Sequence, residues 1–271
     1  MSSTPNVPYR LEFSVEVPGT REQVWRAIAT APGLSSWFLP TVLEEREGGA
    51  LRFEMGEGMG SEGHVTRWDP PHTLGYEEDW AALMGKSPAE LSPMTSEFVI
   101  ESNSGGTCVV RVTTSGFGTG ADWEQEWWDD MGRSWIPSFD ILRLYLARFP
   151  GQQATPVEVS ATHPGDEDAV WASARDALGL TDGGQAVSLL GTTGVVERVD
   201  DRHALVQLDT PVPGMLTATA HEMQDGEVTV WVRAFLFGPD AEAYARDQAP
   251  AWQRHLESLP LSPTATTNAP R

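Results

Sequence analysis

Hydrophobic residues recur at helical spacing from Asp122 to Phe149 and predict one long amphipathic helix. The apolar positions fall at steps of three, four or seven, so they form a single stripe that needs a covering surface. Asp122 and Gln125 are expected to form an N-cap pair, and Pro137 is expected to kink the helix near 133–136. The stripe consists of Trp128, Met131, Trp135, Phe139, Leu142, Leu146 and Phe149.

Before this helix, alternating apolar and polar residues predict an antiparallel sheet. Tyr9 to Val17 is expected to be the first strand, and Thr20 with Gln23 forms a capping box that opens a short helix. Between 41 and 115, about six further strands are separated by Gly-Gly pairs and other turn residues. The insertion Trp80 to Pro93 interrupts them, and we expect it to be a lid or rim loop.

The second half of the chain repeats this order in a shorter form. The sequence VEVSATHPGDEDAVWASARDALGL at 157–180 echoes VEVPGTREQVWRAIATAPGL at 15–34, with matching residues at identical spacing. Strand-like runs and a closing amphipathic helix from Asp240 to Leu259 follow. We therefore expect two domains, at residues 9–150 and 157–260, of which the second is a smaller, degenerate copy of the first.

Charge and cysteine content limit the possible partners and the compartment. The chain has 39 acidic and 18 basic residues and a net charge of −21, which repels nucleic acid and anionic membranes. Its apolar runs are too short to span a bilayer, and residues 1–8 lack the basic and apolar parts of a signal peptide. We therefore expect a cytoplasmic protein, in which the single cysteine, Cys108, is a small core residue.

Three stretches resemble the START-like, or SRPBCC, superfamily, in the branch of the activator of the heat-shock-protein-90 ATPase. They are EVPGTREQVWRAIATAPGLSSWF, RWDPPHTLGYEE, and TTSGFG followed by GRSWIPSFDILRLYL, and together they span residues 9–149. The resemblance implies an α+β helix-grip fold, in which a curved antiparallel sheet wraps round its C-terminal helix and leaves an apolar cavity between them. It also implies a possible docking to a chaperone.

Common catalytic and metal-binding motifs do not occur in the sequence. It has no GxSxG, HExxH or P-loop pattern, and its six histidines have no helical ligand spacing, so we expect neither a metal nor a cofactor. Residues 58–63 fit GxGxxG, but a strand rather than a helix is expected to follow them. Since dinucleotide binding needs that helix, a hairpin turn at the cavity mouth is the better interpretation.

Weak candidates for proton transfer are His64 and Tyr76. His64 alternates with Thr66 and Trp68 on one strand face, which we expect to point into the cavity. Adjacent acidic residues do not converge on one point, so we expect them to form solvated faces. These acidic groups are Glu44-Glu45, Glu77-Glu78-Asp79 and Asp129-Asp130.

Aromatic and methionine residues give the main functional hypothesis, which is binding of a small apolar or aromatic ligand between the sheet and the long helix. A solid core made of the same residues is the alternative at the structural level. At the functional level the alternatives are an enzyme of the cyclase or hydrolase type, and a module that docks to a chaperone or to itself. The expected ligand-binding residues are Trp37, Phe38, Phe53, Met55, Trp68, Tyr76, Trp80, Phe98, Trp128, Met131 and Trp135.

Overall fold

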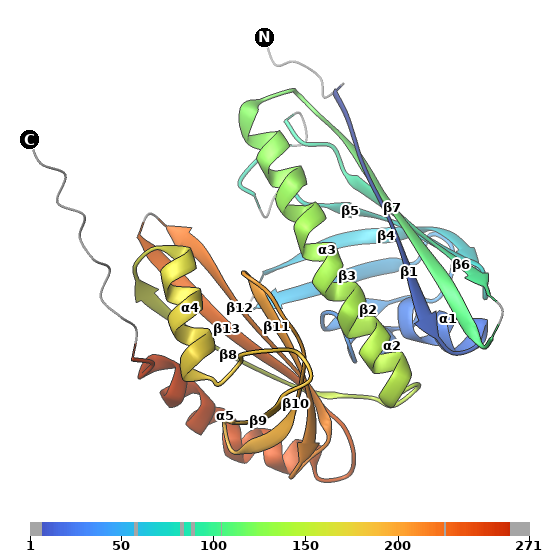
Figure 1. Cartoon of the computed structure of the whole chain (residues 1–271). Coiled ribbons are helices and arrows are strands. Elements are labelled where there is room, and N and C mark those ends of the chain that lie inside the picture. Colours follow the sequence, from blue (N-terminus) through green and yellow to red (C-terminus); the bar gives the residue numbers. More distant parts are fainter. Residues whose placement is uncertain are drawn as a thin grey trace, which may run out of the picture. The chain divides into compact units, whose positions relative to one another are not determined.

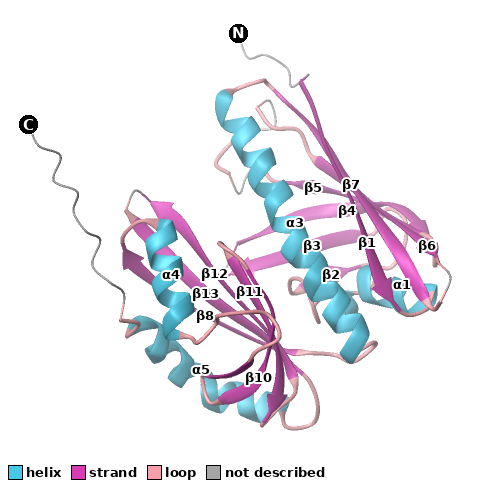
Figure 2. Ribbon diagram, viewed as in Figure 1, coloured by secondary structure: helices cyan, strands magenta, loops and turns pink. Residues whose placement is uncertain are grey.

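The chain divides into two compact units, residues 1–153 and 154–271. The structure, a computed structural model, describes residues 7–56, 59–81, 84–87, 90–103, 105–224 and 226–260. Figures 1 and 2 show helices and strands in both units, and each unit is described by itself below (Figure 1, Figure 2). In the described ranges, no helix is long and apolar enough to cross a membrane.

Unit 1 is built on one antiparallel sheet. The described strands pair in the order β1-β7-β6-β5-β4-β3-β2, so strands joined by hairpins lie side by side and β7 returns to pair with β1. An antiparallel sheet followed by a long C-terminal helix agrees with the helix-grip fold that the resemblance implies. The elements are β1 (Val7–Pro18), α1 (Arg21–Ala29), α2 (Ala31–Leu34), β2 (Thr41–Leu43), β3 (Ala50–Gly56), β4 (Met59–Asp69), β5 (Thr73–Asp79), β6 (Met94–Ser102), β7 (Thr107–Gly118) and α3 (Asp122–Arg148).

The apolar stripe of α3 covers the inner face of this sheet, as predicted (Figure 1). Trp128, Trp135, Phe139 and Leu142 are all at most 8% exposed. Facing them, alternate strand residues are buried, for example Val110 and Val112 of β7. This two-layer arrangement places the aromatic residues of both layers in one interior.

The capping box predicted at the start of α1 is confirmed. The backbone N–H of Gln23 donates to Thr20 Oγ1 at 3.3 Å, and the Thr20 N–H donates to Gln23 Oε1 at 2.8 Å. These bonds satisfy two backbone donors that the first helical turn leaves without partners. Trp25 and Ile28 on the buried side of α1 then pack towards the sheet.

The predicted N-cap pair of α3 is wrong. The N-cap residue is Ala121, which has no capping side chain, and the Gln125 amide instead donates to Asp129 at 2.9 Å. Glu124, in the first turn, instead accepts the backbone N–H groups of Thr119 and Gly120, which precede the helix. The helix continues through Pro137 to Arg148, and the kink predicted there stays a prediction.

Unit 2 repeats the strand order of unit 1 with one strand fewer. Its described strands pair in the order β8-β13-β12-β11-β10-β9, so β8 and β13 correspond to β1 and β7. One helix follows the first strand and one ends the unit, as α1 and α3 do in unit 1. The elements are β8 (Thr155–Pro164), α4 (Glu167–Ala177), β9 (Ala186–Leu189), β10 (Thr192–Val199), β11 (His203–Thr210), β12 (Gly214–Gln224), β13 (Glu227–Leu236) and α5 (Ala241–Glu257).

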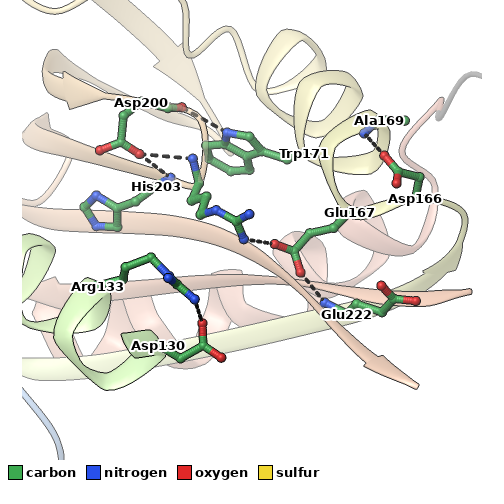
Figure 3. A network of polar contacts seen from close by, with 10 residues as sticks. Asp130, Arg133, Asp166, Glu167, Ala169, Trp171, Asp200, His203 and Glu222 are labelled. Atoms are coloured by element: carbon green, nitrogen blue, oxygen red, sulfur yellow. Dashed lines mark hydrogen bonds and ion pairs between the residues drawn. The ribbon is translucent and has the colours of Figure 1, made fainter. Parts of the chain in front are cut away.

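Polar contacts fasten α4 to the sheet of unit 2 (Figure 3). Glu167, in the first turn of α4, pairs with Arg202 and accepts the backbone N–H of Glu222 at 2.8 Å. One turn later, the Trp171 indole N–H donates to the Asp200 carbonyl at 3.0 Å. The Glu167 carboxylate and the Trp171 indole N–H are therefore satisfied within the fold.

Candidate functional site

Aromatic rings connect α3 to the inner face of the unit 1 sheet. Trp135 of α3 lies at the centre, with ring centroids 5.8 Å from Phe98 of β6 and 5.9 Å from Phe38. The chain of contacts continues across the strands from Phe53 to Tyr76 at 5.7 Å and from Tyr76 to Phe98 at 5.9 Å. At these distances the rings pack directly on one another, and they fill the interior around the middle of α3.

A second aromatic group, the tryptophan cluster Trp80, Trp127 and Trp128, lies at the N-terminal end of α3. Trp127 is 6.2 Å from Trp80 and 5.3 Å from Trp128 between ring centroids. Trp128 stacks on Tyr9 of β1 at 5.4 Å and an interplanar angle of 9°. It also lies over Gly116, where an added Cβ would come within 3.1 Å of the indole ring. Because Gly116 has no side chain, the Trp128 ring can pack directly against the sheet at this position.

Between these aromatic groups the inner face carries a polar strip on β4 to β7. Its members are buried because strand alternation turns them to the same side as their apolar neighbours. The Ser61 hydroxyl donates to Glu78 Oε1 at 2.5 Å, and the Ser96 and Thr114 hydroxyls are bonded at 3.1 Å. The strip consists of Ser61, Tyr76, Glu78, Ser96 and Thr114.

Glu78 is the most unusual group in this strip, because its side chain carries an ionisable carboxyl into an apolar interior. The residue is 5% exposed. Burial raises the pKa of Glu78 to about 7, although the Ser61 hydroxyl and the Trp80 indole N–H act in the opposite direction. The Trp80 N–H lowers the pKa of Glu78 without forming a hydrogen bond of regular geometry. A carboxyl with this pKa can both accept and donate a proton near neutral pH.

The other ionisable groups near the strip differ from Glu78 in protonation state and in hydrogen bonding. Burial, followed by the charge of Glu78, holds the pKa of the Tyr76 hydroxyl well above its ordinary value, so Tyr76 stays neutral and is a hydrogen-bonding group rather than a base. Glu124 is fully buried but accepts four hydrogen bonds from Thr119, Gly120 and Tyr9 at 2.7 to 3.1 Å. Its charge is therefore satisfied within the fold.

The insertion predicted to be a lid or rim loop lies against the N-terminal end of α3. In its described part, Lys86 Nζ lies 4.5 Å from the centroid of the Trp123 ring, a cation–π contact. Its far end is joined to β7, where Ser92 Oγ accepts the Phe117 N–H at 2.8 Å. The segment 80–93 thus links the tryptophan cluster to the sheet beside Glu78. Ala82, Leu83, Pro88 and Ala89 lie outside the described residues.

A comparison with known protein families matches this part of the chain. The family model described as Activator of Hsp90 ATPase homolog 1-like protein matches residues 18–147, which run from the end of β1 almost to the end of α3. Unit 1 is an AHSA1-like domain with the START-like, or SRPBCC, fold. No curated protein matches the chain.

Some solved structures similar to this chain match about half of it, and others match nearly all of it. Protein MLL2253 from Mesorhizobium loti is 19% identical with a TM-score of 0.46, over 52% of this chain and 98% of its own. The Aha1 dimer from Colwellia psychrerythraea is 19% identical with a TM-score of 0.42, over 53% and 99%. The di-domain ARO/CYC BexL from the BE-7585A biosynthetic pathway is 14% identical with a TM-score of 0.43, over 94% and 100%.

The AHSA1-like domain brings most of the predicted ligand-binding residues to its interior. Phe53, Tyr76, Phe98, Trp128 and Trp135 are at most 8% exposed, and Phe38, Met55, Trp80 and Met131 are half-buried. Trp37 is also buried, but its indole N–H donates to the Ala27 carbonyl at 2.9 Å. Trp37 therefore ties the segment after α2 to α1, which is a structural role.

His64 does not point into this interior, so the prediction for it is wrong. A bulge between Val65 and Arg67 shifts the alternation of β4 by one residue. As a result, Trp68 joins the inner face, where its ring lies 5.0 Å from that of Trp25, whereas His64 is exposed on the outer face. Trp68 is therefore packed beside α1 and away from the tryptophan cluster.

The prediction of a solvated acidic face at 77–79 is wrong for Glu78, which is buried on the inner face of β5. Leu74 and Tyr76 share the inner face, and Glu78 is the next residue with the same parity on β5. That alternation was a signal for burial. For the GxGxxG pattern, the hairpin interpretation agrees with the start of β4 at Met59, and Glu57 and Gly58 lie outside the described residues.

Proposed function

We propose that the AHSA1-like domain binds a small, flat and largely apolar molecule on the inner face of its sheet, against the N-terminal half of α3. The observation that carries this proposal is the burial of Glu78 among aromatic side chains. A buried carboxyl without full hydrogen bonding destabilises a fold, and such groups cluster at functional sites. A stability requirement alone would favour an apolar residue at this position.

Aromatic surfaces beside Glu78 support a flat ligand. Trp80 and Trp128 each bury an indole nitrogen that has no regular hydrogen-bond partner among the described residues. Buried indole N–H groups usually find an acceptor, so a ligand with an acceptor group would satisfy them. Entry would lie beside Trp80, which is half-buried.

We expect titration of the chain with planar aromatic compounds to quench tryptophan emission saturably, and native mass spectrometry to detect a one-to-one complex. The Trp80→Phe variant, which keeps a ring but loses the N–H, should lose most of the change in emission and bind about tenfold more weakly. Trp25→Phe is the matched control, since Trp25 lies in the same domain but packs on Trp68. Equal binding by both variants and the parent chain would place the ligand elsewhere.

Docking to a chaperone is the second candidate function, and the family match is the observation that favours it. The family description names an activator of the Hsp90 ATPase. A purified Hsp90 whose ATPase rate increases when the chain is added would support this function. An unchanged rate over a range of chain concentrations that exceeds that of the Hsp90 would speak against it.

A further inference from the structure

We propose that two copies of this chain associate through β1 of the AHSA1-like domain, so that their two sheets continue into one antiparallel sheet. This inference goes beyond the proposed function, because it concerns the edge of the sheet rather than its inner face. β1, dark blue in Figure 1, is an edge strand that pairs with β7 on one side. Among the described residues, nothing hydrogen-bonds to its backbone on the other side.

The edge that β1 presents is long, regular and partly apolar. Its twelve residues pair with β7 without a bulge, whereas the edge strands β2 and β9 have only three and four residues. Natural proteins usually protect a long edge with bulges, with inward-pointing charges or by covering it. The side chains of β1 on the inner face are apolar and only half-buried, so a further strand would cover them. They are Val7, Tyr9, Leu11, Phe13 and Val15.

The register with β7 identifies the backbone groups that face the open edge. Gly19 continues the pairing of β1, and its N–H donates to the Gly106 carbonyl directly opposite at 3.0 Å. Hydrogen-bonded pairs alternate along an antiparallel ladder, so the odd-numbered residues of β1 bond to β7. The even-numbered residues Arg10, Glu12 and Ser14 therefore direct their N–H and C=O groups to the open side.

Unit 2 shows how the same position is covered when the edge is closed. On β8, the Ser160 N–H donates to Gln253 Oε1 of α5 at 3.3 Å, and Gln253 Nε2 donates to the Ser160 carbonyl at 2.7 Å. Ser14 precedes Gly19 by the same number of residues as Ser160 precedes Gly165, and both glycines donate to the opposite strand. In the described part of unit 1, no side chain takes the place of Gln253. An open hollow of about 340 Å³ lies there instead, lined by Glu12, Phe13, Ser14 and Arg111.

Charge complementarity favours a second copy of β1 as the strand that covers this edge. Arg10 and Glu12 are exposed and lie 3.1 Å apart on the outer face. When two identical strands pair in antiparallel fashion, the contacts are two-fold symmetric. Centred on Leu11, the pairing puts Arg10 of each copy opposite Glu12 of the other. Opposite charges at directly facing positions stabilise a sheet, so both pairs contribute to association.

Other symmetric registers are less favourable. Pairing centred on Arg10 or on Glu12 would put like charges directly opposite each other, which destabilises a sheet. Pairing centred on Phe13 would put Arg10 opposite Glu16, but the Glu16 carboxylate already accepts hydrogen bonds from Thr107 at 2.6 Å and from Asn103 at 3.3 Å. The register centred on Leu11 uses the carboxylate with fewer partners.

Backbone hydrogen bonding agrees with the register centred on Leu11. In it, Arg10 and Glu12 of opposite copies face each other, and both have N–H and C=O groups directed to the edge. The Ser14 N–H reaches the Pro8 carbonyl of the second copy, while Pro8 has no N–H to donate in return. The two-stranded contact therefore ends at Pro8, and Leu11 lies opposite Leu11 on the inner face at its centre.

Sedimentation velocity of the full chain, with a pair of charge-reversal variants, tests this inference. The parent chain should convert from monomer to dimer between about 1 and 200 µM, as expected for a small interface. Arg10→Glu and Glu12→Arg, each alone, put like charges opposite at two positions and should weaken the dimer at least about tenfold. An equimolar mixture of the two variants should dimerise like the parent chain, because opposite charges then face each other again.

Arg67→Glu is the matched control, since Arg67 is an exposed outer-face arginine paired with Glu97 but lies on the interior strand β4. This variant should dimerise like the parent chain. Glu12→Pro removes an N–H from the open edge and none from the ladder with β7, so it should keep the circular dichroism of the parent chain and lose the dimer.

Three results would contradict the inference. A parent chain that stays monomeric over this concentration range would overturn it, leave the edge to a strand from a different protein, and leave the proposed ligand binding unaffected. A dimer that is equally stable in Arg10→Glu, Glu12→Arg and Glu12→Pro would place the contact elsewhere on the chain. Failure of the mixed variants to associate, when each alone is monomeric, would overturn the pairing of Arg10 with Glu12.

Discussion

Replacing Glu78 by glutamine is expected to stabilise the AHSA1-like domain by about 3 kcal/mol at pH 8. The pKa of this carboxyl is about 7 in the folded chain, compared with an ordinary value of 4.5. Because folding raises the pKa, the ionised form disfavours the folded state. The penalty is absent below pH 4.5, grows as the pH rises towards 7, and is complete above that value. The gain from Glu78→Gln should therefore disappear near pH 4.

Urea unfolding followed by tryptophan emission measures this effect, since eight of the eleven tryptophans precede residue 154. Glu77→Gln serves as the control, because Glu77 is half-buried on the opposite face of the same strand. Its stability should stay within about 0.5 kcal/mol of the parent chain at both pH values. A Glu78→Gln variant that is no more stable than the parent at pH 8 would show that Glu78 is well solvated or well paired.

Replacing Glu124 by alanine is expected to destabilise the same domain by about 3 kcal/mol at pH 7. The change leaves the backbone N–H groups of Thr119 and Gly120, and the Tyr9 hydroxyl, without their acceptor. Burial raises the pKa of Glu124, but the hydrogen bonds outweigh it and the net shift is downward. Its stabilising effect is therefore present above pH 4.5 and is lost as the pH falls through the lowered pKa.

The comparison for this prediction is Gln125→Ala, which removes an exposed side chain from the same helical turn. That variant should change the free energy of unfolding by less than about 0.5 kcal/mol. Gly118→Ala should resemble Glu124→Ala, since a Cβ at residue 118 would lie 2.1 Å from Glu124 Oε2. If Glu124→Ala and Gln125→Ala unfold at the same urea concentration, Glu124 does not hold the start of α3.

Together these two carboxyls show what a buried charge does in this fold. Glu124 is held by four hydrogen bonds and stabilises the junction between β7 and α3. Glu78 accepts one regular hydrogen bond, from Ser61, and its ionised form is expected to destabilise the sheet that carries it. A residue that lowers stability without a structural task points to a binding or catalytic task.

Much of the fold follows from regular patterns in the sequence. The period of α3 identified the stripe that contains Trp128 and Trp135, and alternation identified the strands because each has one buried face. The capping box formed by Thr20 and Gln23 has a fixed spacing of three residues, and it was predicted correctly for that reason. The echo of the first half at 157–180 likewise predicted that strand, helix, sheet and helix recur in the second half, and a second antiparallel sheet lies there.

The candidate site was harder to predict, since it depends on departures from these patterns. The bulge between Val65 and Arg67 puts Trp68 on the opposite face from His64, and nothing in the residue types near it marks a bulge. Glu78 was assigned to solvent because the acidic residues on both sides of it are common surface residues. Glu78 lies two residues after Tyr76 on β5, so alternation places both side chains on the inner face. That signal conflicts with the general rule that carboxyl groups are rarely buried. The hydrogen bonds of Glu124 depend on the loop before the helix folding back over its carboxylate, which local spacing does not encode.

The most direct test of ligand binding at the polar strip is an NMR titration of the chain labelled with ¹⁵N-tryptophan, using 2-acetylnaphthalene, a planar ring with one carbonyl acceptor, as the probe. The indole N–H signals of Trp80 and Trp128 should shift saturably. Those of Trp171 and Trp252 should stay fixed, because their N–H groups already donate to backbone carbonyls at 3.0 and 2.7 Å. Unmoved Trp80 and Trp128 signals, or equal shifts at all four tryptophans, would contradict a site between the sheet and α3.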